Sequence, residues 1–424
     1  VTAITRSRII ISGDNAFTPE NGVVRGSGTL DDPYIIEGLY IDATQGGGIS
    51  IIGTTKHFII RNCTIITSRA YTLFEELLRW RGKIANPVIR LIEVQNGKIE
   101  NNTFINGSIE LQKTNNIIIM NNTVAGIKLL GSSNTIISYN DIKGNVLISA
   151  SYNTTFSYNR VEDGHLSIGM YSDHINFIGN EFVRGGLFSI LPPHSTIADN
   201  IVNGKPLVYL RYVKNVVIDN AGQVFLENCS NITIRNLYIS DTLRAIALYF
   251  TNYTKIVNNT LTNCDTGIVF YNSFNSIIMN NNIVGNLGGV SLEKSSNNTI
   301  MYNNIMNNHV GIGLMDSSGN AIMNNNIINN RVGINIAGES KRNIIAHNNF
   351  INNIEQVDPK YFNDNSWDLG YSAGGNYWSD HVCTDQYSGE NQDQPGSDGI
   401  CDKPYQKDRY PLAKPIETST STSP

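Results

Sequence analysis

The sequence predicts an all-β protein: a single-stranded right-handed parallel β-helix, or solenoid, of about 14 rungs with a cap at each end. The first observation is a repeat, because glycines that open the phrase Gly-Ile/Val-x-apolar recur at one constant step, at Gly267, Gly289, Gly311 and Gly333. The second is that the apolar runs are short, rich in Ile and bounded by Asn, Gly and Ser, which is typical of strands and turns. Such a unit cannot bury its own apolar face, so the units are expected to stack as coils.

Asparagine keeps the step of the repeat and is expected at the corners between strands. It tolerates the left-handed backbone that a tight corner requires, and stacked amides can hydrogen-bond along the axis of the coil. Isoleucine is expected to fill the interior, because its branched side chain packs well on a pleated surface. The asparagines on this step are Asn62, Asn101, Asn121, Asn140, Asn159, Asn180, Asn200, Asn220, Asn281, Asn303, Asn325 and Asn348.

Departures from the repeat divide the chain. Residues 1–48 precede it and are expected to form an N-terminal cap over open strand edges, and residues 49–355 form the β-helix. Within the β-helix, residues 69–87 are expected to form a short amphipathic helix that projects as a lateral insertion. A Trp-, Asp- and Gly-rich C-terminal capping module covers residues 356–414, and a Ser/Thr-rich tail covers residues 415–424.

Composition and charge argue against several classes of function. Only 16% of the 424 residues are charged and the net charge is -5, so no basic surface for nucleic acid is expected. No apolar stretch reaches the roughly 18 residues that a membrane-spanning helix needs. A first residue other than Met and the low-complexity end IETSTSTSP suggest an exported protein, extracellular or on the cell surface, tethered through its C-terminal tail.

Asn-x-Ser/Thr triplets also favour export, because they are acceptors for N-glycosylation, although an asparagine-rich chain generates some by chance. The triplets at Asn62, Asn101, Asn121 and Asn258 lie on the corner step, where the amides are expected to be committed to the ladder and unmodified. The better candidates for glycosylation are Asn106, Asn153, Asn228, Asn231, Asn252 and Asn297.

Two stretches at the ends of the chain resemble a known family. ISGDNAFTPENGVVRGSGTLDDPYIIEGLYI and GGNYWSDHVCTDQYSGENQDQPGSDGICDKPYQKDRYPL are similar to the end modules of archaeal NosD-type proteins, the "carbohydrate-binding and sugar hydrolase" (CASH) class of β-helix repeat proteins. The resemblance spans essentially the whole chain and is most specific in these modules. It implies an exported right-handed β-helix but no single activity, because relatives include surface proteins, sugar-active proteins and copper-site accessory proteins.

The C-terminal module differs from the pattern of that family at two cysteines. Cys383 and Cys401 stand where the family usually has small residues, and two cysteines that occur together in an exported, loop-rich module predict a disulfide. The remaining thiols, Cys63, Cys229 and Cys264, each follow an Asn at a strand edge and are expected to be buried.

The same module is rich in carboxylates. Hard carboxylate oxygens in a flexible loop suit Ca²⁺, and a solvated acidic turn is an equally good interpretation. Calcium is the only cofactor that the sequence suggests, and no organic cofactor is expected. The candidate ligands are Asp380, Asp385, Asp393, Asp398 and Asp402.

One outward face of the repeat carries candidate binding side chains. Aligning the repeats places aromatic and charged residues in one outward column and in its neighbour, and rings beside carboxylates suit stacking on sugars and hydrogen bonding to their hydroxyls. The alternative is a ladder stabilised only by its own cross-rung stacking. The candidate glycan-binding residues are Tyr209, Arg211, Glu227, Tyr249, Tyr271 and Glu293.

No catalytic set is visible in the sequence. Glu227 and Glu293 are expected three rungs apart, about 14 Å at the usual spacing, which exceeds the roughly 5–9.5 Å between paired glycosidase carboxylates. The seven histidines scatter without metal spacing, which also weakens a copper role. His165, His174 and His194 fall on nearby rungs and are expected to be ordinary solvated or capping histidines.

The sequence therefore favours a non-catalytic, extracellular or cell-surface structural protein. Its expected partners are copies of itself, in a surface layer, sheath or filament, or cell-surface glycans. The rival interpretation is a polysaccharide lyase or glycoside hydrolase that acts on the outward Tyr/Glu face.

Overall fold

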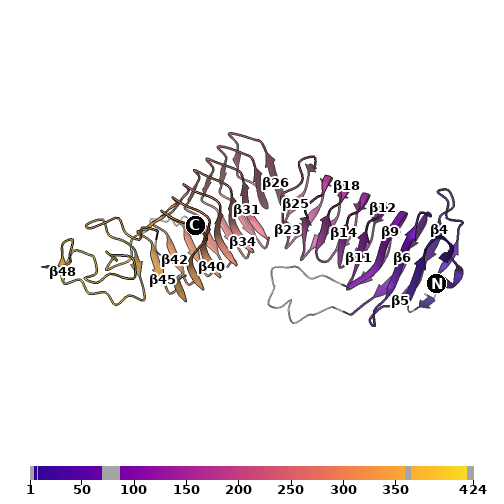
Figure 1. Cartoon of the computed structure of the whole chain (residues 1–424), viewed down its shortest axis with the longest axis horizontal. Coiled ribbons are helices and arrows are strands. Elements are labelled where there is room, and N and C mark those ends of the chain that lie inside the picture. The colour runs from indigo at the N-terminus through magenta and orange to yellow at the C-terminus, as the bar shows by residue number, and fades with distance from the viewer. Residues whose placement is uncertain (1–3, 7, 69–85, 359–363, 418–424) are drawn as a thin grey trace. The chain divides into compact units, whose positions relative to one another are not determined.

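The computed structural model describes residues 4–6, 8–68, 86–358 and 364–417. Contacts divide the chain into two units, Val1–Pro206 and Leu207–Pro424, and each is described by itself. Both are built almost entirely of strands stacked side by side in chain order (Figure 1). The predicted all-β parallel solenoid of about 14 turns is confirmed. Within the described residues, no helix is long and apolar enough to cross a bilayer.

Three sheets make up the first unit, and their strands pair in parallel from coil to coil. Sheet A consists of β1 (Ile4–Arg6), β5 (Leu39–Asp42), β8 (Thr64–Ile66), β10 (Thr103–Ile105), β13 (Thr123–Val124), β16 (Asp141–Ile142), β19 (Arg160–Glu162), β22 (Glu181–Val183) and β25 (Ile201–Val202). Sheet B consists of β2 (Arg8–Ser12), β6 (Gly48–Thr54), β9 (Asn86–Glu100), β11 (Gly107–Gln112), β14 (Gly126–Leu130), β17 (Val146–Ser149), β20 (His165–Ile168) and β23 (Gly186–Leu187). Sheet C consists of β4 (Tyr34–Glu37), β7 (Phe58–Arg61), the second half of β9, β12 (Asn115–Met120), β15 (Ser133–Ser138), β18 (Tyr152–Ser157), β21 (Asp173–Ile178) and β24 (Thr196–Ala198).

The first strands of these sheets lie inside the predicted N-terminal cap. β1 pairs with β5 and β2 pairs with β6, so residues before 48 already belong to the parallel sheets. Two 3-10 turns, η1 (Asp14–Ala16) and η2 (Pro19–Asn21), and the short antiparallel strand β3 (Val23–Arg25) interrupt them. Of the lateral insertion predicted over residues 69–87, residues 69–85 lie outside the described part of the chain, and Asn86 and Pro87 begin β9.

Three parallel sheets also make up the second unit. Sheet D consists of β26 (Lys205–Arg211), β28 (Gln223–Glu227), β31 (Arg244–Tyr249), β34 (Thr266–Tyr271), β37 (Gly288–Glu293), β40 (Val310–Met315), β43 (Val332–Ala337) and β46 (Glu355–Val357). Sheet E consists of β27 (Val217–Ile218), β29 (Thr233–Arg235), β32 (Lys255–Val257), β35 (Ile277–Met279), β38 (Thr299–Met301), β41 (Ala321–Met323) and β44 (Ile344–Ala346). Sheet F consists of β30 (Tyr238–Ser240), β33 (Thr260–Thr262), β36 (Asn282–Val284), β39 (Asn304–Met306), β42 (Asn326–Ile328), β45 (Asn349–Ile351) and β47 (Tyr377–Trp378).

The interior of the second unit is filled by aliphatic residues in register. Ile268, Val290 and Ile312 lie opposite one another on successive strands and are at most 1% exposed. The glycine step follows from the same close stacking, since a Cβ at Gly311 would lie 2.5 Å from the carbonyl oxygen of Gly333. Glycine is thus required where one rung approaches the backbone of the next.

Buried asparagines join the rungs through their side-chain amides. The side-chain Nδ2 of Asn303, which is fully buried, donates to the carbonyl oxygens of Ile278 and Met301 at 2.9 and 3.0 Å and to Oδ1 of Asn325 at 2.9 Å. Its own Oδ1 accepts from the backbone N–H and the amide of Asn281, both at 2.9 Å. Each amide therefore satisfies backbone groups that the corner would otherwise bury unpaired.

Among the described residues, this pattern forms one ladder in the first unit and three in the second. The first unit has Asn102, Asn122, Asn140, Asn159, Asn180 and Asn200. The second unit has Asn259, Asn281, Asn303, Asn325, Asn348 and Asn376 at one corner. A second corner has Asn286, Asn308, Asn330 and Asn353, and a third has Asn298, Asn320, Asn343 and Asn365.

Where two asparagines follow one another, the residue that enters the ladder is one position later than predicted. Asn101 is exposed at the corner with φ 55°, whereas Asn102 is 2% exposed and enters the ladder. The left-handed residue points its side chain outward, so the next residue faces inward. The prediction that the corner triplets are committed to the ladder is therefore wrong, since the residues concerned all have positive φ and exposed side chains: Asn62, Asn101, Asn121 and Asn258.

The C-terminal module provides the end of one ladder. Asn376, the last amide of its corner, donates its backbone N–H to Oδ2 of Asp408 at 2.7 Å, where the next asparagine oxygen would lie. The indole N–H of Trp378 donates to the same oxygen at 2.8 Å. Trp378 also stacks on Phe350 of the last full rung, with ring centroids 4.2 Å apart. Nearby, the predicted disulfide between Cys383 and Cys401 is present, as is the short antiparallel pair β48 (Tyr387–Ser388) and β49 (Gln394–Pro395).

We predict that Asn303→Ala lowers the free energy of unfolding by on the order of 4 kcal/mol, because it leaves several buried backbone groups without partners. Asn307→Gly is the matched control. Asn307 is exposed with φ 55°, a conformation that glycine adopts freely, so the loss there should stay below about 1 kcal/mol. Denaturant unfolding of both variants measures the difference, and equal losses would contradict the ladder as a source of stability.

Asp408 should make stability depend on pH. Burial raises the pKa of its carboxyl to about 6 from 3.8, against the opposing hydrogen bonds from Asn376, Trp378 and Tyr410. The folded chain therefore binds this proton more tightly than the unfolded chain, and the resulting stability is complete below about pH 4 and lost as the pH rises through about 6.

The variant Asp408→Asn keeps an oxygen for Asn376 and Trp378 and cannot titrate. The free energy of unfolding of the wild type, relative to this variant, should fall by up to about 3 kcal/mol between pH 4 and pH 7. A difference that does not change over this range would show that Asp408 is ionised throughout.

Candidate functional site

The outward column on sheet D lies in the predicted register. Arg211 of β26 pairs with Glu227 of β28, which pairs with Tyr249 of β31. Tyr249 in turn pairs with Tyr271 of β34, and Tyr271 with Glu293 of β37. The sequence therefore predicted correctly which side chains share this column. Glu227 and Glu293 are three pairings apart, so their carboxylates do not form a glycosidase pair.

Aromatic rings pack against one another along this column and its neighbour. The ring centroids of Tyr209 and Phe225 are 5.9 Å apart, those of Phe225 and Tyr249 are 6.2 Å apart, and those of Tyr249 and Tyr271 are 6.1 Å apart. Phe225 is fully buried and Tyr249 is 8% exposed. The face is thus less exposed here than the sequence suggests, because each ring covers the next.

Glu227 is held in a hydrogen-bonded network inside this stack. Its Oε2 accepts from the hydroxyl of Tyr209 and from Nε of Arg211, both at 2.8 Å, and forms an ion pair with Nη2 of Arg211 at 2.8 Å. Burial disfavours the charged guanidinium, but the hydrogen bonds and charges of Glu227 and Tyr209 together outweigh this, and the pKa of Arg211 is raised. The carboxylate of Glu227 therefore serves to hold Arg211 and Tyr209 in place.

Tyr249 belongs to a second group that the sequence did not reveal. Arg244 donates to its hydroxyl, and burial raises the pKa of Tyr249. Burial also raises the pKa of Asp265 to about 6, while the guanidinium of Arg244 works in the opposite direction. Asp265 follows a corner asparagine and a buried cysteine, a context that gives no sign in the sequence of an acid with an altered pKa.

The exposed end of the column forms a small platform around Tyr271. Phe250 meets the ring of Tyr271 edge-on with centroids 5.7 Å apart and is 43% exposed. The Lys294 amine lies 5.7 Å from the centroid of the same ring, and Glu293 is partly exposed beside it. Phe250 and Lys294 were missed because they follow Tyr249 and Glu293 at left-handed corners, with φ 52° and 49°, where the period of two breaks.

The five aspartates of the C-terminal module are mostly engaged by their own loops. Asp385 accepts from Ser397 Oγ at 2.7 Å and from the backbone N–H groups of Asp398 and Gly399 at 3.0 Å. Asp402 accepts from the N–H groups at positions 386 and 387. Asp380 accepts from side chains at positions 356 and 405. Asp398 accepts from positions 392 and 400, and Asp393 is exposed.

The three remaining cysteines are buried, as predicted. Cys63 and Cys264 each donate a backbone N–H to the first asparagine of a ladder, Asn102 and Asn286, and Cys229 donates to Thr251 Oγ1 in another column. Burial raises the pKa of the Cys63 thiol to about 11 and that of Cys264 to about 12. These thiols are therefore unreactive at neutral pH.

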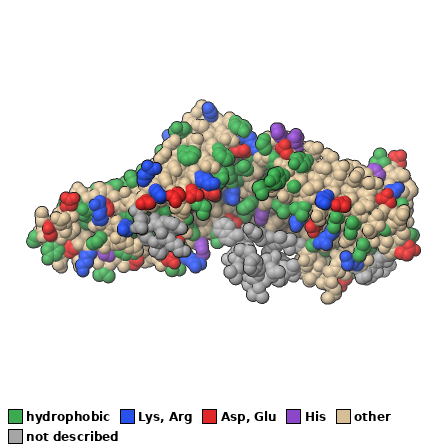
Figure 2. Space-filling model, in the orientation of Figure 1, with side chains coloured by type: hydrophobic (Ala, Val, Ile, Leu, Met, Phe, Trp, Pro, Cys, Tyr) green, Lys and Arg blue, Asp and Glu red, His purple; other side chains and the backbone are tan. Residues whose placement is uncertain are grey.

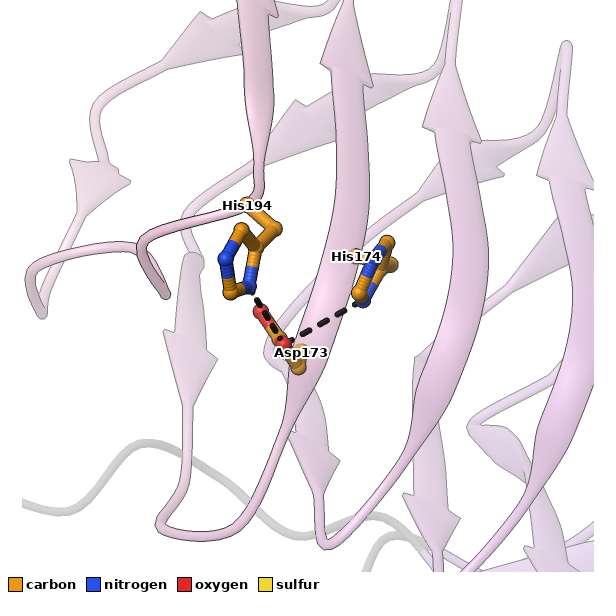
Figure 3. Close-up of side chains that lie close together, drawn as sticks. All are labelled: Asp173, His174 and His194. Carbon is orange, nitrogen blue, oxygen red and sulfur yellow. Dashed lines mark hydrogen bonds and ion pairs between the residues drawn. The ribbon is translucent and has the colours of Figure 1, made fainter.

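The sequence predicted histidines scattered without metal spacing, but the structure brings two of them together beside an aspartate. Within the part of the chain that the structure describes, one group of three or more His, Cys, Asp or Glu side chains has ligand atoms within 4.8 Å of one another: Asp173, His174 and His194 (Figure 3). Histidines gather beside acidic side chains on the face drawn in Figure 2. His165 lies apart from this group, packs on Phe188 with centroids 5.6 Å apart, and has its pKa lowered to about 4 by burial.

The six glycosylation candidates lie at or near the surface. Five are exposed: Asn106, Asn153, Asn228, Asn231 and Asn297. Asn252 is partly buried, and its Oδ1 accepts from the backbone N–H of Phe274 at 2.8 Å. Exposure makes the five accessible, and modification of these residues stays a prediction.

The fold and these surface groups define a parallel β-helix repeat protein. Residues 194–383 match the family model described as "Periplasmic copper-binding protein (NosD)", which covers fewer than half of the 424 residues. No curated protein sequence matches the chain.

Several solved structures resemble the chain at low identity. The periplasmic alginate epimerase AlgG is 13% identical over 86% of this chain and 83% of its own, with a TM-score of 0.32. The A-module of mannuronan C-5 epimerase AlgE4 from Azotobacter vinelandii is 11% identical over 77% of this chain and 90% of its own, with a TM-score of 0.24. Tailspike protein 3 of bacteriophage CBA120 is 9% identical over 86% of this chain and 53% of its own, with a TM-score of 0.26. At such TM-scores none of these likenesses supports an argument about activity.

Calcium binding in the C-terminal module stays a prediction of the sequence, with a competing explanation in the loop hydrogen bonds. If Ca²⁺ binds there, removing it with EGTA should lower the melting temperature by several degrees, and added Ca²⁺ should restore it. An unchanged melting temperature would contradict calcium binding, and the carboxylates would then serve only to order their own loops by hydrogen bonds.

Proposed function

We propose that this chain is a non-catalytic β-helix protein that acts outside the cytoplasm and binds glycans at the exposed end of the outward column on sheet D. The observation that carries the proposal is the platform of Tyr271, Phe250, Glu293 and Lys294. It places an aromatic face beside one anionic and one cationic side chain on adjacent rungs.

Such a platform suits a sugar ring. The apolar C–H face of a pyranose can stack on Tyr271, and Phe250 extends the apolar surface at the corner. Glu293 accepts hydrogen bonds from sugar hydroxyls, and Lys294 donates them or pairs with a uronic carboxylate. The internal network of Arg211, Tyr209 and Glu227 supports the stack from below and is not itself part of the binding surface.

Location outside the cytoplasm is supported by the periplasmic description of the matched family. The disulfide between Cys383 and Cys401 supports it independently, because such bonds persist in oxidising compartments. Self-assembly, a cell-surface tether and an archaeal source remain expectations from the sequence.

The rival proposal is a polysaccharide lyase or glycoside hydrolase. The observation in its favour is Asp265, whose pKa of about 6 suits a general acid or base near neutral pH, close to the Arg244 and Tyr249 pair. Glu227 is a poor candidate for that role, because its carboxylate is already bonded by two side chains.

The experiment is calorimetric titration with a panel of neutral and acidic oligosaccharides, followed by assays for reducing ends and for unsaturated products. We expect at least one glycan to bind without turnover. Tyr271→Ala should weaken that binding at least about tenfold, because the stacking face is lost.

Tyr253→Asn is the matched control. Tyr253 is 58% exposed at a left-handed corner of the same unit, with φ 56°, and asparagine occupies the adjacent rungs of that column. Its replacement should leave binding unchanged. If the wild type forms product and Asp265→Asn does not, the result would favour the enzyme. If Tyr271→Ala and Tyr253→Asn bind the glycan equally weakly, the platform is not the binding site.

A further inference from the structure

The group of Asp173, His174 and His194 arises from the register of two adjacent rungs. Asp173 and His174 begin β21, and His194 lies two positions before β24. Asn176 of β21 pairs with Thr196 of β24, and the same offset along the chain places His194 beside His174. Figure 3 shows both imidazoles directed at the carboxylate of Asp173.

Both rings present a nitrogen to the same oxygen. Nδ1 of His194 lies 2.8 Å from Oδ2 of Asp173, and Nδ1 of His174 lies 3.2 Å from it. The two rings stack with centroids 5.0 Å apart and an interplanar angle of 24°. The three ligand atoms lie within 4.8 Å of one another, so small rotations of exposed side chains suffice to place them around one ion at about 2.0–2.2 Å.

The second carboxylate oxygen of Asp173 gives independent evidence for a bound cation. Oδ1 is buried and has no hydrogen-bond partner among the described residues, whereas the imidazoles of His174 and His194 are 57% and 67% exposed. A buried carboxylate oxygen without a donor is costly unless a cation neutralises it. The site thus combines a carboxylate, one oxygen of which lacks a donor, with two accessible imidazoles.

The position of His174 in the corner column argues against a purely structural role. The preceding rungs carry Asn134 and Asn153 at this corner, with φ 51° and 49°, joined by an amide hydrogen bond of 3.2 Å. His174 has the same conformation, with φ 54°. Asparagine satisfies the corner on those rungs, so the change to two stacked histidines beside an aspartate is not required by the fold.

We propose that Asp173, His174 and His194 bind one divalent transition-metal ion of the Zn²⁺ or Cu²⁺ class. Two imidazoles and one carboxylate are the ligands that these borderline ions prefer, and the exposed side leaves positions for water or an incoming ligand. Hard ions such as Ca²⁺ and Mg²⁺ prefer all-oxygen sites and should bind weakly. The proposal rests on the geometry of these side chains, since the segment that matches the family model contains only His194 of the three.

Calorimetric titration of the untagged chain with ZnCl₂, and separately with CuSO₄, tests the proposal. At least one of the two metals should bind tightly at one ion per chain, and CaCl₂ should not compete. His174→Asn and His194→Asn should each weaken binding at least about tenfold. Asparagine already occupies the corner of His174 on the preceding rungs, at Asn134 and Asn153, and the side chain of His194 is 67% exposed. Both replacements should therefore leave the fold intact, which circular dichroism checks.

His309→Asn is the matched control, because His309 is exposed in the second unit and far along the chain from the group. Its affinity for the metal should equal that of the wild type. For bound Cu²⁺, electron paramagnetic resonance should show coupling to two imidazole nitrogens and to one in either histidine variant. Absence of one-site binding by both metals would overturn the proposal, as would equal affinity of all three variants.

Discussion

The hydrogen bond from one buried asparagine to the next is the interaction on which the structure depends. A coil with tight corners turns backbone N–H and C=O groups toward the interior, where water cannot reach them. The amide of Asn303 satisfies three such groups: its Nδ2 donates to the carbonyl oxygens of Ile278 and Met301, and its Oδ1 accepts from the backbone N–H of Asn281. Each ladder brings the same corner of successive coils into line, and it therefore helps to set the register of the outward columns beside it.

Because the ladders use the interior, function is left to side chains on the outside. Sheet D shows two uses of one column. Around Glu227 the side chains bond to one another and are buried or half-buried, which makes them part of the scaffold. Around Tyr271 the same column is partly exposed and is flanked by the exposed side chains of Phe250 and Lys294, which can contact a ligand. In such a repeat protein, an outward column can bind a ligand only where its side chains are accessible to solvent.

The sequence was sufficient for the repeat and for register, because a fixed period specifies which residues meet. It predicted the neighbours of Tyr249 and the bond between Cys383 and Cys401. It misplaced the ladder at Asn101 by one position, because only the backbone angles distinguish two consecutive asparagines. It also missed the meeting of His174 with His194, since the coil length varies in the first unit and only the observed pairing of β21 with β24 brings them together.

Hydrogen exchange of asparagine side chains tests the central claim most directly. In protein labelled with ¹⁵N at asparagine and transferred to D₂O, the amide protons of the ladder residues should persist as long as the backbone amides of the core strands, while those of corner residues such as Asn101 should exchange at once. Two such populations of asparagine side chains would support the account. Rapid loss of all side-chain amide signals, with the backbone still protected, would contradict it.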